Sequence, residues 1–420
     1  MSTSRALDRK RDERYYAAFV CKSVVEIEEA YLSLAAWCRA RDYAGYDPFD
    51  GLNSRIFQST PLRRSRTARL GWTQIFKRSP VNLRPLAGVP VGKNAKGIAL
   101  FALAALSRFR ALRTEEPKRE AYLLLDDLLA MRLDGWSGAA WGYNFDWQGR
   151  AFFAPRGTPT VVPTAFAARA LIEAAQVFND ARYVNAARGA CEFILRDLDL
   201  SVDAEDEICF SYSPLDRTRV FNASLLAAET LSCVGALTNE DELREKSMLA
   251  TNYVVRRQRA DGSWAYGADD YQSWADNFHT AFVLASLLRI RRTVDRDMDE
   301  LTQAIERGYR FWRREFFLAD GGPKYYHDKP YPADAHAAGA ALVTFTEMQG
   351  VDAGASDIAE KVARWAITHL RDERGFFWYQ RKRFYAVRTP YMRWSQGWML
   401  YGLAKLIEGK SEKVKRKSAD

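Results

Sequence analysis

The chain has 420 residues, of which 48% are hydrophobic and 27% are charged. This length and composition are typical of a globular protein with one large domain or two to three smaller ones. They argue against a membrane-spanning protein, because no uncharged apolar run approaches the ~18 residues that a bilayer span requires. Residues 1–14 are polar and charged, without the apolar core of a signal peptide, so we expect a flexible N-terminus and a cytoplasmic location.

The five cysteines are scattered along the chain, and none forms a CxxC pair. An odd number without paired spacing indicates reduced thiols and argues against a disulfide framework or a zinc site. The sequence also has no P-loop, no dinucleotide-binding glycine motif, no serine nucleophile elbow and no HExxH motif. We therefore expect neither a metal nor a cofactor.

The net charge of +9 is concentrated in one segment. Residues 51–114 include thirteen Lys and Arg but no Asp or Glu, whereas the rest of the chain is slightly acidic. A local excess of positive charge indicates an anionic partner such as a membrane surface, although a solvated basic surface would give the same pattern. No nucleic-acid reader motif accompanies the segment, so we do not expect a nucleic-acid partner.

The first predicted helix covers residues 15–41, where apolar residues recur at helical spacing. A long connection follows over 42–92, with a short basic amphipathic helix predicted at 62–78. Connections of this length are unusual in compact domains, so we expect a functional or docking role for it. Residues 94–109 then form an alanine- and leucine-rich helix that is apolar nearly all round and should be buried.

One unit recurs from residue 118 onward: an amphipathic helix, an aromatic turn and a very apolar helix. Its clearest copy is residues 258–290, where Asp261 and Gly262 form the bend. With the first pair, this gives twelve helices in six pairs at a period of roughly 50–70 residues. The further helices are predicted at 118–132, 163–178, 181–196, 222–234, 241–258, 276–291, 297–316, 334–348, 356–371 and 393–406, before a charged tail at 409–420 that we expect to be disordered.

Repeating helix pairs must stack to bury their apolar faces, and an open stack needs polar end caps. The first and last apolar helices are as apolar as the others, so neither pair is such a cap. The pattern therefore predicts one all-α domain over residues 15–408, in which six hairpins close into a ring with the apolar helices inside. The aromatic turns and the N-terminal ends of the inner helices would then meet at one rim.

The turn Gln258-Arg-Ala-Asp-Gly-Ser-Trp264 resembles the Q-x-x-D-G-S-W repeat of squalene-cyclase and prenyltransferase toroids, and similar turns occur in carbohydrate-active toroids. The resemblance extends over nearly the whole chain and implies an (α/α)6 toroid. The D-x-D-D motif of terpene cyclases and the zinc ligands of protein prenyltransferases are not recognisable. This favours the carbohydrate-active members, which include polysaccharide lyases, unsaturated-glucuronyl hydrolases, N-acylglucosamine 2-epimerases and glucuronyl C5-epimerases. Residues 46–54, Tyr-Asp-Pro-Phe-Asp-Gly-Leu-Asn-Ser, also resemble toroid proteins encoded with bacterial surface-polysaccharide genes.

The candidate catalytic residues lie at the predicted rim. His279 and His336 stand in the first turn of adjacent inner helices, so ring closure would bring them together. A helix N-terminus favours the neutral imidazole that a general base requires, although each histidine could instead only satisfy local backbone groups. Tyr266 and Tyr326, from the neighbouring turns, are the candidate partners in proton transfer.

Hydrolysis of a glycosidic bond would instead need two carboxylates across that bond. Asp276 and Asp334 stand where inner helices begin, so capping of the helix competes with catalysis as their role. The carboxylates expected near the rim are Asp47, Asp50, Asp146, Asp276 and Asp334.

Substrate binding is expected from aromatic rings, which stack on sugar faces, from amides, and from arginines that hold a carboxylate in bidentate fashion. Some of the aromatic turns would instead only pack against each other. The candidate substrate-binding residues are Trp141, Tyr143, Asn144, Asn222, Trp264, Asn277, Arg393 and Trp394, and Arg150, Arg156 and Arg388 are further candidate carboxylate ligands.

These features predict an enzyme that acts on an anionic, uronate-containing poly- or oligosaccharide in bacterial surface-polysaccharide metabolism. The predicted reaction is lyase- or epimerase-type proton abstraction beside the carboxyl group. Three alternatives remain open. They are a glycoside hydrolase, a non-catalytic module that binds glycan or docks through residues 62–78, and a terpenoid-cyclase-like enzyme whose cavity would be aromatic and nearly free of Arg and Asn.

Overall fold

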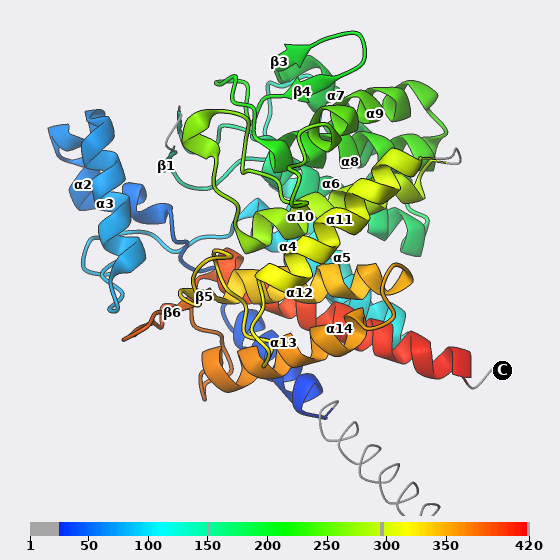
Figure 1. Ribbon diagram of the computed structural model, residues 1–420. Helices are drawn as coiled ribbons and strands as arrows, with labels where there is room; N and C mark the ends of the chain where they lie inside the picture. Colours follow the sequence, from blue (N-terminus) through cyan, green and yellow to red (C-terminus); the bar gives the residue numbers. More distant parts are fainter. Residues whose placement is uncertain (1–24, 150–151, 295–297, 418–420) are drawn as a thin grey trace, which may run out of the picture.

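The computed structural model describes residues 25–149, 152–294 and 298–417. In these ranges the chain forms the predicted all-α ring of helical hairpins (Figure 1). The outer helices are residues 25–39, α5 (Glu115–Ala130), α7 (Ala181–Asp197), α9 (Asp241–Val255), α11 (Asp299–Glu315) and α13 (Ala355–Leu370). The inner helices are α4 (Ala95–Leu112), α6 (Val161–Phe178), α8 (Phe221–Thr238), α10 (Asn277–Arg292), α12 (Ala335–Glu347) and α14 (Trp398–Lys417).

The inner helices contact one another in chain order, and α14 contacts α4, so the ring closes as predicted. The contact between α12 and α14 is especially close. A Cβ atom on Gly339 would lie 2.5 Å from the backbone carbonyl of Trp398, so only glycine fits there without a shift of the backbone. Gly402 on α14 lies at the same contact: a Cβ atom on it would lie 2.7 Å from the Gly339 carbonyl oxygen.

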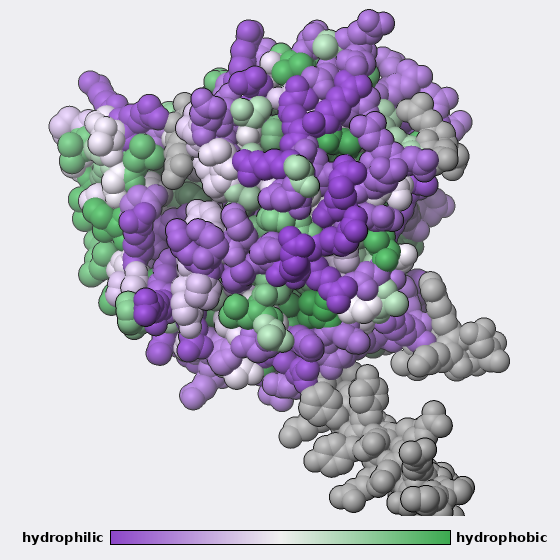
Figure 2. Space-filling view, viewed as in Figure 1, coloured by the Kyte–Doolittle hydropathy of each residue, from purple (hydrophilic) through white to green (hydrophobic). Residues whose placement is uncertain are grey.

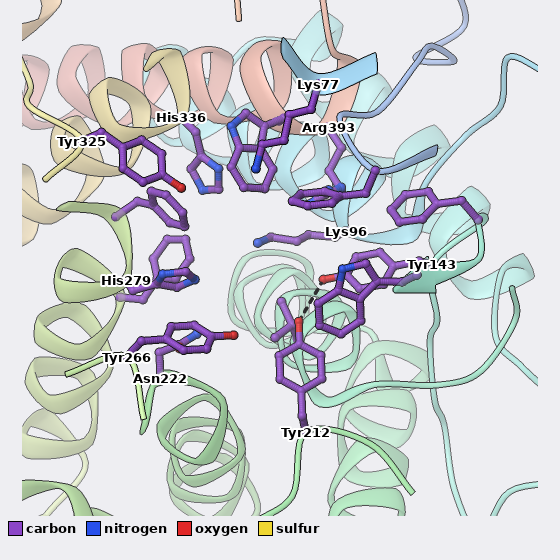
Figure 3. A pocket seen from close by; sticks show the side chains of 17 residues that line it. Lys77, Lys96, Tyr143, Tyr212, Asn222, Tyr266, His279, Tyr325, His336 and Arg393 are labelled. Carbon is purple, nitrogen blue, oxygen red and sulfur yellow. Dashed lines mark hydrogen bonds between the residues drawn. The ribbon is translucent and has the colours of Figure 1, made fainter. Parts of the chain in front are cut away.

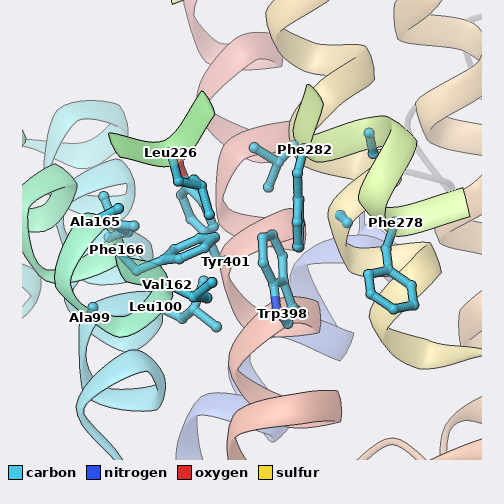
Figure 4. Close-up of a cluster of buried hydrophobic side chains, with 14 of the residues drawn as sticks. Ala99, Leu100, Val162, Ala165, Phe166, Leu226, Phe278, Phe282, Trp398 and Tyr401 are labelled. Atoms are coloured by element: carbon cyan, nitrogen blue, oxygen red, sulfur yellow. The ribbon is translucent and has the colours of Figure 1, made fainter. Parts of the chain in front are cut away.

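The centre of the ring is filled by an aromatic floor (Figure 4). Phe166, Phe282 and Trp398 come from α6, α10 and α14, and their ring centroids lie 5.0 to 5.9 Å apart. A buried ion network lies on the same inner helices further from their N-terminal ends. In it Glu229 pairs with Arg169 at 2.6 Å and with Arg289 at 3.1 Å. Burial alone would raise the pKa of Glu229, but the two arginines hold it below its usual value.

Short antiparallel strand pairs stand in the turns between helices. They are β1 (Trp147–Gln148) with β2 (Phe153–Ala154), β3 (Leu200–Asp203) with β4 (Ile208–Phe210), and the three-stranded set of β5 (Ala333–Asp334), β6 (Gln380–Arg381) and β7 (Ala386–Val387).

The long connection folds into a separate small unit beside the ring, at the left of Figure 1. It contains α2 (Arg55–Gln58) and α3 (Arg66–Arg78), and Phe76, Ala87 and Val89 form a small core of its own. The predicted helix at 62–78 is therefore present but shorter, because Pro61 begins a separate 3-10 turn and Ser65 caps α3 through the Ala68 amide.

The end of the chain differs from the prediction. The last helix was expected to end at Leu406 before a disordered tail at 409–420, but α14 continues to Lys417. Charged residues there find partners: Lys410 pairs with Glu360 of α13 at 2.7 Å, and Lys405 pairs with Glu408 one turn along α14. The predicted flexible segment, residues 1–14, lies outside the described residues.

Among the described helices, α6 is long and apolar enough to cross a membrane by length and composition alone, with a mean hydropathy of 1.3. It is an inner helix of the ring, and 72% of its residues are buried there. Burial in a protein core accounts for this composition.

Candidate active site

The same position of every inner helix faces one cavity at the rim (Figure 3). It is the second residue of α4, α6, α8, α10 and α12, and of the π-helical turn Met392–Gly397 that leads into α14. Equivalent positions on equivalent helices point to the ring axis, so the sixfold repeat generates the site directly. These six residues are Lys96, Val162, Asn222, Phe278, His336 and Arg393, and they line a cavity of about 140 Å³.

His279 follows one position after Phe278, and a carboxylate orients its ring. Its Nδ1 lies 2.7 Å from Oδ2 of Asp276, whose other oxygen accepts the His279 amide at 3.0 Å and so caps α10. The predicted capping role of Asp276 is confirmed, and the residue also fixes the imidazole. This leaves Nε2 of His279 available to the cavity.

His336 is held quite differently. It is 1% exposed and stacked between Phe278 and Trp398, with ring centroids at 4.4 and 4.9 Å. Neither ring nitrogen has a hydrogen-bond partner among the described residues. Burial and the charges of Lys96 and Arg393 lower the pKa of His336 well below its usual value, so the ring is neutral.

Asp334 caps α12, as the sequence suggested, by accepting the His336 amide at 2.7 Å. Its other oxygen accepts from Gln380 at 2.6 Å, and the Trp394 indole donates to the same carboxylate at 3.2 Å. Burial raises the pKa of Asp334 to about 6 in spite of these hydrogen bonds.

Lys96 reaches the centre of the cavity from α4 (Figure 3). Its Nζ lies 4.3 Å from the ring centroid of Phe166 and 5.1 Å from that of Phe282, so the ammonium rests on the aromatic floor. It forms no ion pair with a described residue, and burial lowers its pKa well below the usual value.

Two further basic side chains face the cavity. Lys77 extends from α3, with Nζ 4.6 Å from the ring centroid of Phe49, and burial lowers the pKa of Lys77 to about 8. Arg393 binds Asp47 in bidentate fashion at 2.6 and 2.8 Å. Asp50 of the same stretch pairs with Arg84 at 2.5 Å. Residues 46–54 thus anchor the connection to the rim, and Asp47 and Asp50 are not free carboxylates.

Four tyrosines also line the cavity: Tyr143, Tyr212, Tyr266 and Tyr325. The hydroxyls of Tyr143 and Tyr212 lie 3.4 Å apart. The ring of Tyr266 stacks on Trp274 and lies 4.7 Å from that of His279. Burial raises the pKa of Tyr266 and Tyr325, so both hydroxyls are protonated hydrogen-bond donors.

The structure brings together seven of the twelve candidates named from the sequence. One of them, Asn222, has a buried Oδ1 without a partner among the described residues. The seven are Tyr143, Asn222, Tyr266, His279, His336, Arg393 and Trp394.

Tyr326, a predicted catalytic residue, lies instead in an outer cleft of about 550 Å³ at the cavity mouth. Its neighbour Tyr325 takes the place in the inner cavity. Tyr326 forms an antiparallel β-bridge with Asp276, so the backbone is extended there. Successive side chains of extended backbone point to opposite sides, so Tyr325 faces the inner cavity and Tyr326 does not.

Four other predicted substrate-binding residues have structural roles. The buried indoles of Trp141 and Trp264 donate to the carbonyls of Leu128 and Val254, near the ends of the preceding outer helices, at 2.7 and 2.9 Å. Asn144 accepts a hydrogen bond from Asn94 at 2.8 Å. Asn277 is buried and donates to the carbonyls of Phe316 and Lys324. These four residues hold the turns in place and do not line the inner cavity.

The remaining carboxylate ligands named from the sequence are not at the site. Arg156 is exposed, and Arg388 is exposed and stacked on Trp378 at 4.4 Å. Arg150 lies outside the described residues.

Sequence reasoning missed Lys96, although its place in the first turn of an inner helix, matching that of His336, was a signal for it. Lys77 and Phe49 carried no such signal, because their place depends on how the connection folds over the rim. Within the described ranges, no Asp or Glu lines the inner cavity.

No protein-family model and no curated protein matches the chain. Solved structures do. A cellobiose 2-epimerase from Bacillus thermoamylovorans has a TM-score of 0.62 at 14% identity, covering 78% of this chain and 90% of its own. A GH76 α-mannanase from Bacteroides thetaiotaomicron has a TM-score of 0.56 at 13% identity, and the match covers 77% of this chain and 87% of the mannanase. A D-mannose isomerase has a TM-score of 0.56 at 11% identity, and the match covers 74% of this chain and 86% of the isomerase. At these identities the likeness establishes the fold, and the chain is an (α/α)6 toroid.

Proposed function

We propose that this protein is a carbohydrate-active enzyme that moves a proton at a sugar carbon beside a uronate carboxyl group, as an epimerase or a lyase. One observation carries the proposal. The inner cavity presents two histidines and three basic side chains, and none of the described residues that line it is a carboxylate. Such a set suits removal of a proton from a carbon atom whose neighbouring carboxylate is neutralised.

His279 is the proposed general base. When its Nε2 takes the proton, the hydrogen bond from Nδ1 to Asp276 stabilises the imidazolium that forms. His336 stands beyond the ring of Phe278, which contacts both histidines with centroids at 4.2 and 4.4 Å. Because His336 is neutral, its N–H serves as a hydrogen-bond donor to the substrate. The protonated hydroxyl of Tyr266 or Tyr143 supplies the proton that an epimerase returns to the carbon or that a lyase gives to the leaving oxygen.

A saccharide substrate is supported by the aromatic walls, since sugar faces stack on rings such as Trp147 and Trp394. It is also supported by likeness, because the similar structures include a cellobiose 2-epimerase and a D-mannose isomerase. The setting in cytoplasmic, bacterial surface-polysaccharide metabolism is part of the same proposal.

The two enzyme alternatives have less support. For a hydrolase, the five predicted carboxylates are engaged in helix caps or in contacts with Arg, Gln or His side chains. The structural similarity to a mannanase is nevertheless as high as that to the D-mannose isomerase. For a terpenoid cyclase, the aromatic walls fit, but Lys96, Arg393 and Asn222 are polar groups that a hydrocarbon would leave unsatisfied.

The test is turnover of acidic oligosaccharides in D₂O. Nuclear magnetic resonance would detect deuterium at the sugar carbon, and absorbance would detect a new unsaturated uronate. We expect His279→Ala and His336→Ala to abolish both signals while circular dichroism stays unchanged. His369→Ala is the control, because His369 contacts Arg381 and Trp365 away from the cavity. Full activity in both cavity variants would refute the assignment.

The second candidate role is docking on an anionic surface, predicted for residues 51–114. Some basic residues of that segment are engaged inside the protein, such as Arg84 and Arg108. The small unit around α2 and α3 nevertheless exposes hydrophobic surface next to hydrophilic surface, at the left of Figure 2. Its large exposed apolar residues are Ile56, Leu62, Ile75, Val81, Leu86 and Val91.

A further inference from the structure

Three polar groups at the closed end of the cavity lack partners, and they point into the same space (Figure 3). Lys96, His336 and Asn222 are 3%, 1% and 4% exposed and come from three different inner helices. Within the described residues, the ammonium lies over aromatic rings without an ion pair, and Arg393 and Arg169 add positive charge nearby. The imidazole and the amide oxygen have no hydrogen bond among these residues. A buried polar group without a partner is destabilising, so this arrangement is explained by a ligand that satisfies all three groups.

The chemistry of the three groups describes that ligand. Lys96 has no counter-ion of its own, because Asp47, the carboxylate whose charge acts on it, is already bound to Arg393. A carboxylate can accept from the Lys96 ammonium and from the His336 N–H together. The Asn222 oxygen needs a donor, and a sugar hydroxyl supplies one. A uronate ring presents both groups.

The shape of the site limits how a uronate enters. Figure 4 shows Phe166, Phe282 and Trp398 packed together in the floor. Nζ of Lys96 lies 4.3 to 5.4 Å from their ring centroids, so these rings close the inner cavity below Lys96. The cavity of about 140 Å³ opens into the outer cleft of about 550 Å³. A unit within a chain has two linkages, and both would have to leave by this one mouth, whereas a terminal unit has only one.

We propose that Lys96 and His336 form a subsite for the carboxylate of a chain-terminal uronate, which enters acid-first and leaves the rest of the saccharide in the outer cleft. The enzyme then acts at chain ends. The reaction at that end rests on the proposed function, but binding of the terminal acid does not.

The first experiment compares the affinities of methyl glucuronide and methyl glucoside by calorimetry. We expect the wild type to prefer the acid at least tenfold and Lys96→Met to lose the preference. Its melting temperature should be unchanged or higher, because an unpaired buried ammonium is replaced by an apolar chain of similar length. Lys93→Met, which alters a surface lysine paired with Asp42 and Asp127, should keep the preference. No acid preference in the wild type, or a retained preference in Lys96→Met, would overturn the subsite.

His336→Phe provides a second variant, since a phenyl ring fits the same stack between Phe278 and Trp398. It should also reduce the preference for the acid, and it keeps the test decisive if Lys96→Met does not fold.

The second experiment compares two tetrasaccharides, one with glucuronate at its non-reducing end and one with glucuronate only at an internal position. We expect at least tenfold tighter binding of the first, and equal affinities would overturn end recognition. Acid preference without any turnover would remove the proposed reaction and leave the subsite. If Lys96→Met still turned over internal uronates, the proposed reaction would stand and the terminal-acid subsite would be overturned.

Discussion

Asp276 and Asp334 stand at the same place before adjacent inner helices, but only one of them reaches a histidine ring. His279 is three residues after Asp276, so one carboxylate can bind both the amide and the Nδ1 of that residue. His336 is only two residues after Asp334, and its ring turns into the aromatic stack instead. A difference of one residue therefore separates an oriented base from an unpartnered neutral imidazole.

Substitution of the two aspartates should separate catalysis from capping. Asn preserves an N-cap, so Asp276→Asn and Asp334→Asn should both fold. We expect Asp276→Asn to lower kcat by about 10²–10⁴-fold with little change in KM, because the imidazolium loses its carboxylate. Asp334→Asn should lower kcat far less. Steady-state kinetics on the same oligosaccharide would measure this, and equal effects would contradict the assigned base.

At the scale of elements, α3 belongs to the site as well as to the surface. The Trp72 indole donates to the Gly51 carbonyl at 3.0 Å, and Phe76 packs in the small core, so the helix is fixed over the rim. From there Lys77 extends into the cavity wall. An insertion in the sequence thereby supplies a cation that the six-hairpin repeat does not.

Lys77 predicts a pH dependence of binding. Burial lowers its pKa to about 8, so the free protein holds the charge below pH 8 and loses it as the pH rises. The affinity for methyl glucuronide should therefore fall above pH 8, by up to about tenfold per pH unit. Lys77→Met should bind more weakly below pH 8 and show a shallower decline, because Lys96, whose pKa burial also lowers, still loses its charge. Calorimetry between pH 7 and 9.5, with methyl glucoside as the uncharged control, would measure it, and an identical profile in the variant would exclude Lys77.

At the scale of the molecule, α3 lines the cavity mouth, and the β6–β7 hairpin lies near this helix. Lys382 of this hairpin is close enough to Arg78 of α3 for the two charges to interact. Both elements expose large apolar side chains, with Leu86 80% and Phe384 86% exposed, beside basic residues such as Arg63 and Arg383. Apolar side chains among basic ones suit the interface of an anionic membrane.

Vesicle sedimentation tests this docking role. We expect the protein to sediment with phosphatidylcholine vesicles that contain phosphatidylglycerol, less so at high salt, and not with phosphatidylcholine alone. The double substitution Leu86→Ser and Phe384→Ser should weaken binding by roughly tenfold or more. Leu123→Ser, at a similarly exposed leucine on α5, is the matched control. Equal sedimentation of the double variant, or salt-independent binding to neutral vesicles, would contradict the prediction.

The sequence determined the fold because this fold follows from local patterns of apolar residues along the chain. Apolar spacing set each helix, and the equally apolar end helices indicated closure, which the contact of α14 with α4 confirms. It also placed His279, His336 and Asn222 at one cavity, because each stands in the first turn of an inner helix. The same pattern pointed to Lys96.

Only the tertiary structure decided the rest, because those choices depend on single positions or on contacts between distant residues. One step of extended backbone placed Tyr325 in the cavity and Tyr326 outside it. Asp47 binds Arg393, which is 346 residues further along the chain. Trp141 and Trp264 are buried because each indole finds a carbonyl of the preceding outer helix. No local pattern records any of these partners, so the sequence determined the ring, and tertiary packing selected which side chains face its cavity.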